Sequence, residues 1–158
     1  MKSRRPGWEQ IYLPLRPNHR TGWVRNAQVN LTVDSYRVGV TLSTHMLTVW
    51  KNGRVVERER AGVGAAATPT PKGRFYLVEL LVQTDPHGVY GPYAFGLSAF
   101  SDVLSSFGGG PGQIGFHGTD EPAALGTNVS HGCIRISNQA ITKLARLLPL
   151  GTPVVISN

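Results

Sequence analysis

Hydrophobic and polar residues alternate in short runs from residue 36 onward, which is the pattern of β-strands that bury one face. The first runs are "YRVGVTL" (36–42) and "HMLTVW" (45–50), and the turn-forming "KNG" (51–53) then leads into "RVVERERAGVG" (54–64). Because tight connections favour antiparallel neighbours, these runs predict a meander of three antiparallel strands.

Three further strands are expected beyond the meander. The segment "ATPTPKGRF" (67–75) interrupts the alternation with two prolines and a glycine, and its threonines are candidates for a role beyond turning the chain. "RFYLVELLV" (74–82) then predicts a strand, as do the shorter "QIGFH" (113–117) and "TPVVI" (152–156).

The alternation is weak between residues 85 and 112, where Gly, Ser and aromatic residues predominate. We expect this long irregular segment to be a binding loop or lid. Within it Tyr90 and Tyr93 are candidate substrate-pocket residues, and packing against the core is the alternative for each.

One helix is predicted, over "NQAITKLARLLP" (138–149). Asn138 is its predicted N-cap, and Pro149 with Gly151 ends it. The apolar residues of this segment recur at helical spacing: Ile141, Leu144, Ala145 and Leu148.

Composition agrees with a mainly β fold, because Gly and Pro total 30 of the 158 residues and favour many short strands with turns. A chain of this length can bury a core without metal or disulfide support. We therefore predict a mainly β sandwich or barrel with one helix in the C-terminal half.

The N-terminal segment differs from the rest of the chain in charge. Of the net charge of +7, residues 1–26 account for +5. Residues 11–31 predict two short strands around the turn "RPNHRTG", and they resemble the end of a bacterial Src-homology-like small barrel; a two-stranded extension packed on the main domain is the alternative. We therefore divide the chain into 1–33 and a main domain, 34–158.

The basic segment could meet an anionic membrane, nucleic acid or an acidic cell-wall polymer, or have no partner at all. Nucleic acid is the weaker choice, since the segment has no recognition helix, zinc-finger spacing or ribonucleoprotein-type aromatic signature. No stretch is apolar enough to span a membrane, and "MKSRRPGWEQ" does not lead into the apolar region of a signal peptide. An extracytoplasmic protein would therefore need an export signal that this sequence lacks.

Cys133 is the only cysteine, and it lies in "SHGCIRISN" (130–138). A single cysteine excludes an internal disulfide and a zinc site built from several thiolates. Burial as a small hydrophobe, catalysis as a nucleophile, and a metal site with His117 and His131 are left open. A working nucleophile needs a histidine or another positive neighbour that lowers the pKa of the thiol.

Two histidines are candidates for that neighbour. His131 precedes the cysteine by two residues, so in an extended segment it shares the face of Cys133 and can contribute to a pocket or an oxyanion site. His117 ends a predicted strand, and a return to the neighbouring strand would place it across from Cys133. We therefore prefer His117 as the general base.

The segment "HGTDEPAALGTNVSHGCIR" (117–135) resembles the signature of the L,D-transpeptidase (YkuD-like) catalytic domain family. "TPTPKGRF" (68–75) and "LLPLGTPVVI" (147–156) are also similar to that family, so the resemblance covers roughly residues 36–156. It implies a β-rich fold in which a cysteine attacks peptidoglycan stem peptides after meso-diaminopimelate. An acyl-thioester forms, a D-amino acid leaves, and an amine of a second stem completes a 3→3 cross-link.

The same resemblance implies residue roles. Cys133 is the nucleophile, His117 the general base, and the backbone N–H groups near Gly132 and Cys133 the oxyanion donors. The base must also be oriented by a third group. Since Gly118 has no side chain, its carbonyl, Thr119 or a more distant group is expected to do this.

Three polar residues complete the predicted site. Arg135 suits a carboxylate of the substrate or an internal ion pair. Ser130 and Thr119 are candidates to bond the histidines, with local backbone bonds as the alternative. No metal or organic cofactor is expected.

The predicted function is therefore peptidoglycan L,D-transpeptidation. An L,D-carboxypeptidase, in which water resolves the same acyl-enzyme, is the enzymatic alternative, and a non-catalytic wall-binding module is the alternative from another class. The substrate implies an extracytoplasmic, cell-wall location, with the given chain a truncated or mature fragment.

Overall fold

The structure, a computed structural model, describes residues 2–158. The predicted meander is present as β4 (Tyr36–Thr41), β5 (Met46–Lys51) and β6 (Arg54–Arg60), which pair antiparallel in sequence order. The alternation predicts its buried face, because Val38, Val40, Leu47 and Val49 are all in the core.

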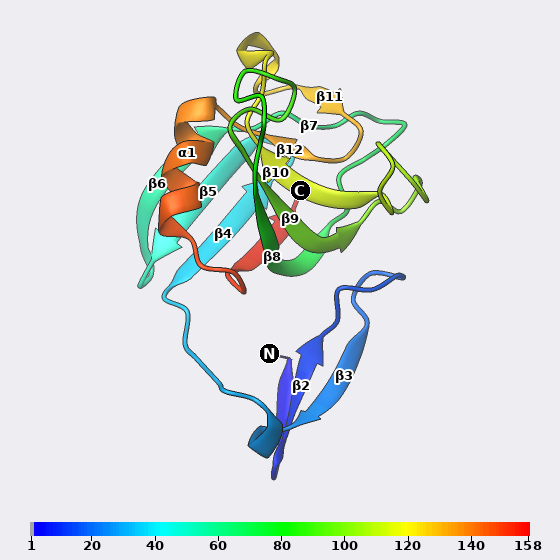
Figure 1. The fold of residues 1–158 in the computed structure, drawn as a ribbon, viewed down its shortest axis with the longest axis vertical. Helices are drawn as coiled ribbons and strands as arrows, with labels where there is room; N and C mark the ends of the chain where they lie inside the picture. The colour runs from blue at the N-terminus through cyan, green and yellow to red at the C-terminus, as the bar shows by residue number, and fades with distance from the viewer. Residues whose placement is uncertain (1) are drawn as a thin grey trace.

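The meander forms one side of an eight-stranded mixed sheet with the order β12-β10-β9-β8-β13-β4-β5-β6 (Figure 1). A small two-stranded sheet lies beside it and pairs β7 (Val63–Gly64) with β11 (Asn128–Ser130). The mainly β class is confirmed. The remaining strands of the large sheet are β8 (Gly73–Val82), β9 (Tyr93–Phe100), β10 (Gln113–His117), β12 (Ile134–Arg135) and β13 (Pro153–Ser157).

The predicted helix is α1 (Asn138–Leu147), which packs its apolar face on the sheet near β9. Ile141 and Leu144 are fully buried, and each such burial stabilises the fold by about 1.5–3 kcal/mol. The prediction of Asn138 as N-cap was wrong by one residue. Ser137 is extended, and its Oγ accepts a hydrogen bond from the N–H of Ala140 at 3.1 Å.

Strand β9 corrects the expectation that residues 85–112 are irregular throughout. Five successive residues, 95–99, are buried in this strand, so the side chains on both faces are covered. A strand buried on both faces has no alternation of polar and apolar residues, and small residues such as Gly96 and Ala99 hide it further. The segments on either side of β9 stay irregular.

The N-terminal residues form a separate three-stranded antiparallel sheet (Figure 1). The two predicted strands are β2 (Trp8–Tyr12) and β3 (Thr21–Arg25), and β1 (Ser3–Arg5) adds a third. A short 3-10 helix, η1 (Asn26–Gln28), and an extended segment then lead to β4. The resemblance of residues 1–33 to the end of a small barrel stays a prediction.

The loop between β2 and β3 is bound to the main domain. Asn18 donates its side-chain N–H to the carbonyl of Phe100 at 2.7 Å and accepts from the Phe100 N–H at 2.9 Å. Beside it, the Arg16 guanidinium donates to three carbonyls of the segment that follows β9. Within residues 2–158, no helix has the length and apolar character that crossing a membrane requires.

Candidate active site

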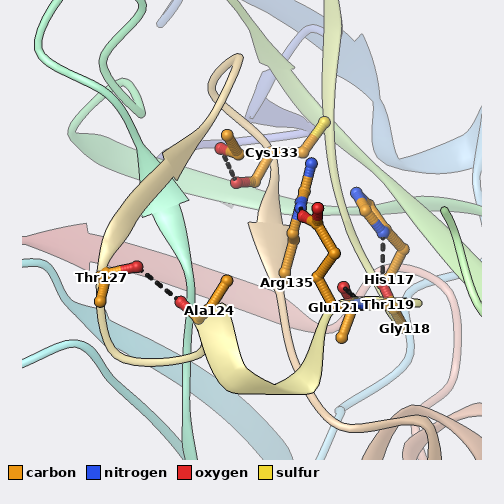
Figure 2. Close-up of polar contacts among 9 residues, drawn as sticks. His117, Gly118, Thr119, Glu121, Ala124, Thr127, Cys133 and Arg135 are labelled. Carbon is orange, nitrogen blue, oxygen red and sulfur yellow. Dashed lines mark hydrogen bonds and ion pairs between the residues drawn. The ribbon is translucent and has the colours of Figure 1, made fainter.

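The site forms where β10 and β12 run parallel at one edge of the large sheet. Their register places His117 beside Arg135 and Phe116 beside Ile134, so Cys133 lies just before β12 next to Gly115. The expectation that His117 pairs directly across from Cys133 was therefore wrong by two residues. Because side chains two residues apart share a face, Cys133, Arg135 and His117 nevertheless extend into the same region (Figure 2).

The turn before Cys133 is held by three hydroxyl groups. Ser130 Oγ accepts from the Gly132 N–H at 3.1 Å and donates to the Cys133 carbonyl at 2.5 Å. Thr70 Oγ1 donates to the Gly132 carbonyl at 2.9 Å, and Thr68 Oγ1 donates to the Ser130 carbonyl at 3.2 Å. The threonines of "TPTPKG" thus brace the segment that presents the cysteine.

Gly132 itself has φ +116, a backbone conformation that side chains disfavour. A Cβ at this position would lie 2.9 Å from Ile114 Cδ1. Its N–H already donates to Ser130, whereas no described residue accepts a hydrogen bond from the N–H of Cys133. Of the two predicted oxyanion donors, only the Cys133 N–H is therefore unengaged within residues 2–158.

His117 is buried, with 4% of its surface exposed, and its Nδ1 lies 2.7 Å from the Gly118 carbonyl oxygen. A carbonyl can only accept, so Nδ1 carries the proton and Nε2 is left as the acceptor nitrogen. Burial lowers the pKa of His117 to about 4, although the Gly118 hydrogen bond opposes the shift. Of the orienting groups left open by the sequence, the structure thus uses the Gly118 carbonyl.

Gly118 has no room for a side chain. A Cβ there would lie 2.2 Å from Asn138 Oδ1 and 2.9 Å from the Cα of Gly91. Asn138 Oδ1 accepts from the Thr119 N–H at 2.8 Å, and Thr119 Oγ1 accepts from the Glu121 N–H at 3.0 Å. Asn138, excluded as the helix cap, instead holds the backbone that follows the histidine, and the Thr119 hydroxyl makes a local turn.

Arg135 pairs with an acidic side chain beside the site. Its Nη1 donates to Glu121 Oε2 at 2.8 Å (Figure 2). Glu121 directly precedes the short 3-10 helix η2 (Pro122–Ala124). The Arg135 Nε is buried, with no hydrogen-bond partner in the part of the chain that the structure describes. Its Nη2 donates to no described residue and is not buried, so this atom is the donor left for a ligand, while Glu121 partly balances the charge.

The Cys133 thiol is partly buried, and burial raises its pKa. A backbone hydrogen bond from Gly115 and the charge of Arg135 act in the opposite direction and are weaker. A raised pKa for the thiol and a lowered pKa for the imidazole of His117 mean that both groups are neutral at pH 7. The resting site is thus a thiol and an imidazole, with no ion pair between them.

Aromatic rings cover the site. Tyr90 contacts the His117 ring edge-on with centroids 4.8 Å apart, and Phe107 stacks on His131 with centroids 4.9 Å apart. His131 is exposed, so this stacking fixes a histidine at the surface of the site. Tyr90 and Phe107 both come from the irregular segments that flank β9.

Two cavities meet at the thiol. One, of about 270 Å³, is lined by residues of β8, β9 and β10, and the other, of about 190 Å³, is lined by His131, Ser130 and Arg135. Cys133, His117, Tyr90 and Phe107 border both. Cys133 and His117 can therefore be approached from two sides.

One predicted pocket residue and two further histidines lie away from the thiol. Tyr93 packs partly against the core and lines neither cavity. His45 contacts Asn128, and the His19 ring packs tilted against Phe75. Within residues 2–158, no group of three or more His, Cys, Asp or Glu side chains could hold a metal ion.

Sequence reasoning missed several residues of this site. Phe107 and Asn138 act across long chain separations and have no local signal. Thr70 does have one, because it lies in the "TPTPKG" segment, whose threonines suggest a role beyond a turn. Gly115 of β10 lies directly beside Cys133. A glycine inside a strand is itself a sign that another group approaches the backbone closely.

The chain is similar in sequence to L,D-transpeptidase catalytic domains. The family model described as the L,D-transpeptidase catalytic domain, YkuD, matches residues 35–156. "Putative L,D-transpeptidase YkuD" of Bacillus subtilis (strain 168) is 35% identical over 122 residues, which is 77% of this chain and 66% of that protein. The chain thus spans slightly less than two thirds of this curated relative.

Solved structures show the same fold. An L,D-transpeptidase from Mycobacterium smegmatis has a TM-score of 0.63 at 18% identity, covering 99% of this chain and 80% of its own. L,D-transpeptidase 3 from Mycobacterium tuberculosis has a TM-score of 0.65 at 16% identity, covering 96% and 79%. With its cysteine and histidine at one sheet edge and the family model matched over 35–156, the chain belongs to the YkuD family of L,D-transpeptidase catalytic domains.

Proposed function

We propose that this chain is a peptidoglycan L,D-transpeptidase that forms 3→3 cross-links through an acyl-thioester on Cys133. The observation that supports this most is the pair of cavities that meet at Cys133 and His117. An acyl donor can occupy one cavity while an amine acceptor approaches through the other. Hydrolysis would need only one cavity and access for water.

In the acylation step, Nε2 of His117 takes the thiol proton as sulfur attacks the carbonyl carbon of the donor's diaminopimelate. The new oxyanion is stabilised by the N–H of Cys133, and one preorganised donor of this kind is worth about 3–4 kcal/mol. The bond to the terminal D-amino acid then breaks, its nitrogen receives the proton from His117, and a thioester remains.

In the second step, an amine of another stem peptide attacks the thioester carbon. His117 takes the proton of that amine and returns it to the Cys133 sulfur as the carbon–sulfur bond breaks. An amide bond joins the two stems, so atoms and charge balance over both steps. Because the resting thiol and imidazole are both neutral, proton transfer has to accompany substrate attack.

The other residues support these steps. Arg135, through its unpaired Nη2, can bind the terminal carboxylate of the donor. His131 and Phe107 form a wall of the smaller cavity, with Ser130 fixing the turn. Tyr90 excludes water from the base by covering the His117 ring.

The proposed reaction also implies binding partners and a location for the protein. Peptidoglycan stem peptides, as donor and acceptor, are the proposed partners, and their location places the working enzyme in the cell envelope. Residues 1–33 are proposed to be a separate module whose basic side chains contact an anionic cell-wall polymer. Arg5 and Arg25 already lie over the rings of Trp23 and Trp8 on one face of its sheet.

The decisive experiment incubates the protein with disaccharide-tetrapeptide and identifies the products by mass. Cross-linked dimer supports transpeptidation, tripeptide alone supports an L,D-carboxypeptidase, and unchanged substrate with retained peptidoglycan binding supports a wall-binding module. Cys133→Ala, checked for folding by circular dichroism, must lose acylation by a carbapenem. If intact mass shows acylation of that variant, Cys133 is not the nucleophile.

A further inference from the structure

A row of four residues crosses the sheet from the thiol into the larger cavity. Register pairs Glu79 of β8 with Gly96 of β9, and Gly96 with Gly115 of β10. Gly115 in turn lies beside Cys133, since the next residues of both segments are paired. Two glycines, Gly96 and Gly115, thus form a glycine floor that lies between Glu79 and Cys133.

An irregularity in β8 turns Glu79 toward this floor. Phe75 and Leu77 alternate into the core, and regular alternation would send residue 79 there as well. The register shifts between Leu77 and Glu79, and Leu80 then packs against the core instead. A β-bulge of this kind re-aims a side chain, and here it aims a carboxylate into a cavity.

The glycines are required for the floor to stay open. A Cβ on Gly96 would lie 2.4 Å from Glu79 Oε1, and a Cβ on Gly115 would lie 2.6 Å from the Phe95 carbonyl oxygen. Because Glu79 Oε1 is so near the position of a Cβ on Gly96, the carboxylate lies over Gly96. Two strand spacings then separate it from Cys133, or about 10 Å.

Glu79 is free to bind a ligand. It is half-buried, it lines the larger cavity, and its carboxylate forms neither a hydrogen bond nor an ion pair with any residue from 2 to 158. The nearby Gln113 amide donates to the Leu97 carbonyl at 3.0 Å instead. With Leu81 and Tyr90 as walls, this cavity fits an alkyl chain whose terminal carbon carries an ammonium group.

We propose that Glu79 binds the ammonium group at the end of the donor side chain, on the residue whose carbonyl carbon Cys133 attacks. This inference rests on the proposed function. The acyl carbon bonds to sulfur, and the side chain of a diamino acid then extends along the glycine floor toward the carboxylate. Glu79 is a specificity-determining residue for donors with a side-chain amine, distinct from the carboxylate recognition assigned to Arg135.

The test compares two tetrapeptide donors that differ only in whether the side-chain amine is present or replaced by hydrogen. Glu79→Gln keeps the shape and removes the charge. It should lower kcat/KM for the amine-bearing donor about tenfold or more, and change it less than twofold for the other donor. Glu79→Asp should fall between the wild type and Glu79→Gln.

Asp85→Asn is the matched control, because it removes one negative charge from an exposed loop outside the cavity. The new amide oxygen can still accept from the His87 N–H, as Asp85 Oδ1 does. This variant should turn over both donors like the wild type. Equal losses for both donors in Glu79→Gln, or no loss for either, would overturn the inference.

A binding measurement separates this inference from the proposed reaction. In the Cys133→Ala background, calorimetry should show that Glu79→Gln weakens the amine-bearing donor about tenfold and leaves the other unchanged. If the wild type forms no product but this difference in binding is present, the reaction fails and the Glu79 site stands. Normal turnover without the difference overturns Glu79 alone.

Discussion

The Nδ1 of His117 lies 2.7 Å from the carbonyl oxygen of the next residue, Gly118. The imidazole, the proposed base, is thus oriented by the neighbouring backbone, and this contact leaves Nε2 as the acceptor nitrogen. The arrangement requires a backbone without a side chain at 118, since Asn138 and Gly91 fill that space. Orientation therefore depends on close packing as much as on hydrogen bonding.

Acid should destabilise the protein through His117. Its pKa is about 4 in the fold and about 6.5 in the unfolded chain, so the unfolded state binds more protons between these values and stability falls as pH drops from 6.5 to 4. The contribution is about 3 kcal/mol, measured by urea unfolding at pH 7 and pH 4. In His117→Asn, which has no titrating group at this position, the free energy of unfolding should fall between pH 7 and pH 4 by about 3 kcal/mol less than in the wild type. Parallel pH profiles for the two proteins would contradict the assignment.

Alkylation of Cys133 should be slow at neutral pH. Because burial raises the pKa of the thiol, the rate with iodoacetamide should rise with pH through an apparent pKa above that of an ordinary cysteine. The measurement is a pH series of alkylation rates by intact mass, with a cysteine-containing peptide as the reference. Rapid alkylation that is independent of pH near 6 would instead reveal a preformed thiolate–imidazolium pair.

Thr70→Val should destabilise the fold and loosen the nucleophile. Thr70 is 4% exposed, accepts from the Gly64 N–H at 2.9 Å and donates to the Gly132 carbonyl. Valine leaves both backbone groups unpaired, and the cost is about 1–3 kcal/mol for the buried Gly132 carbonyl and less for the partly buried Gly64 N–H. Urea unfolding measures the loss, and Thr44→Val, which removes an exposed hydroxyl, is the control. Equal stabilities of the two variants would show that Thr70 has no such role.

The sequence predicts the fold where one face of a strand is buried and the other is polar. The meander of β4, β5 and β6 follows from alternation alone, and α1 follows from its helical spacing. Strand β9 does not, since it is covered on both faces and contains small residues that give no periodic signal. Alternation of polar and apolar residues reveals a strand that buries one face. It does not reveal a strand whose two faces are both covered by tertiary packing.

The candidate site was predictable in its residue types and less so in its geometry. His117 and Cys133 could be identified because their residue types and flanking glycines are local. The parallel register that offsets them by two residues, and the stacking of Phe107 on His131, arise from the sheet order and could not be read from one segment. Glu79 was missed because a bulge in β8 reverses its expected direction.

Gly118→Ala should disturb the base through packing. The added Cβ meets Asn138 Oδ1 at 2.2 Å, and overpacking of this kind costs about 1–3 kcal/mol. Asn138→Ala removes that oxygen, so the double variant should lose less than the sum of the single losses in urea unfolding. Gly110→Ala is the control, because a Cβ there has no neighbour closer than 3.6 Å. Strict additivity would mean that Asn138 does not restrict residue 118.

Arg16→Gln should release the segment that carries Phe107. Its Nη1 donates to the Ser101 carbonyl at 2.7 Å, and its Nη2 donates to the carbonyls of Leu104 at 2.7 Å and Pro111 at 2.8 Å. Charge-assisted hydrogen bonds of this kind contribute about 1.5–3 kcal/mol each, and one guanidinium here joins both ends of the segment.

The measurement for Arg16→Gln is hydrogen exchange of residues 101–112, which should speed up at least tenfold while the strands of the main sheet stay protected. Arg20→Gln is the matched control, since Arg20 is exposed and its side chain donates no hydrogen bond to any residue in 2–158. Because Phe107 borders both cavities, iodoacetamide should also reach Cys133 faster in Arg16→Gln. Unchanged exchange would mean that the segment is ordered by its own contacts, such as the Ser101 N–H bond to the Gly112 carbonyl at 2.8 Å, and that the N-terminal loop does not act on the site.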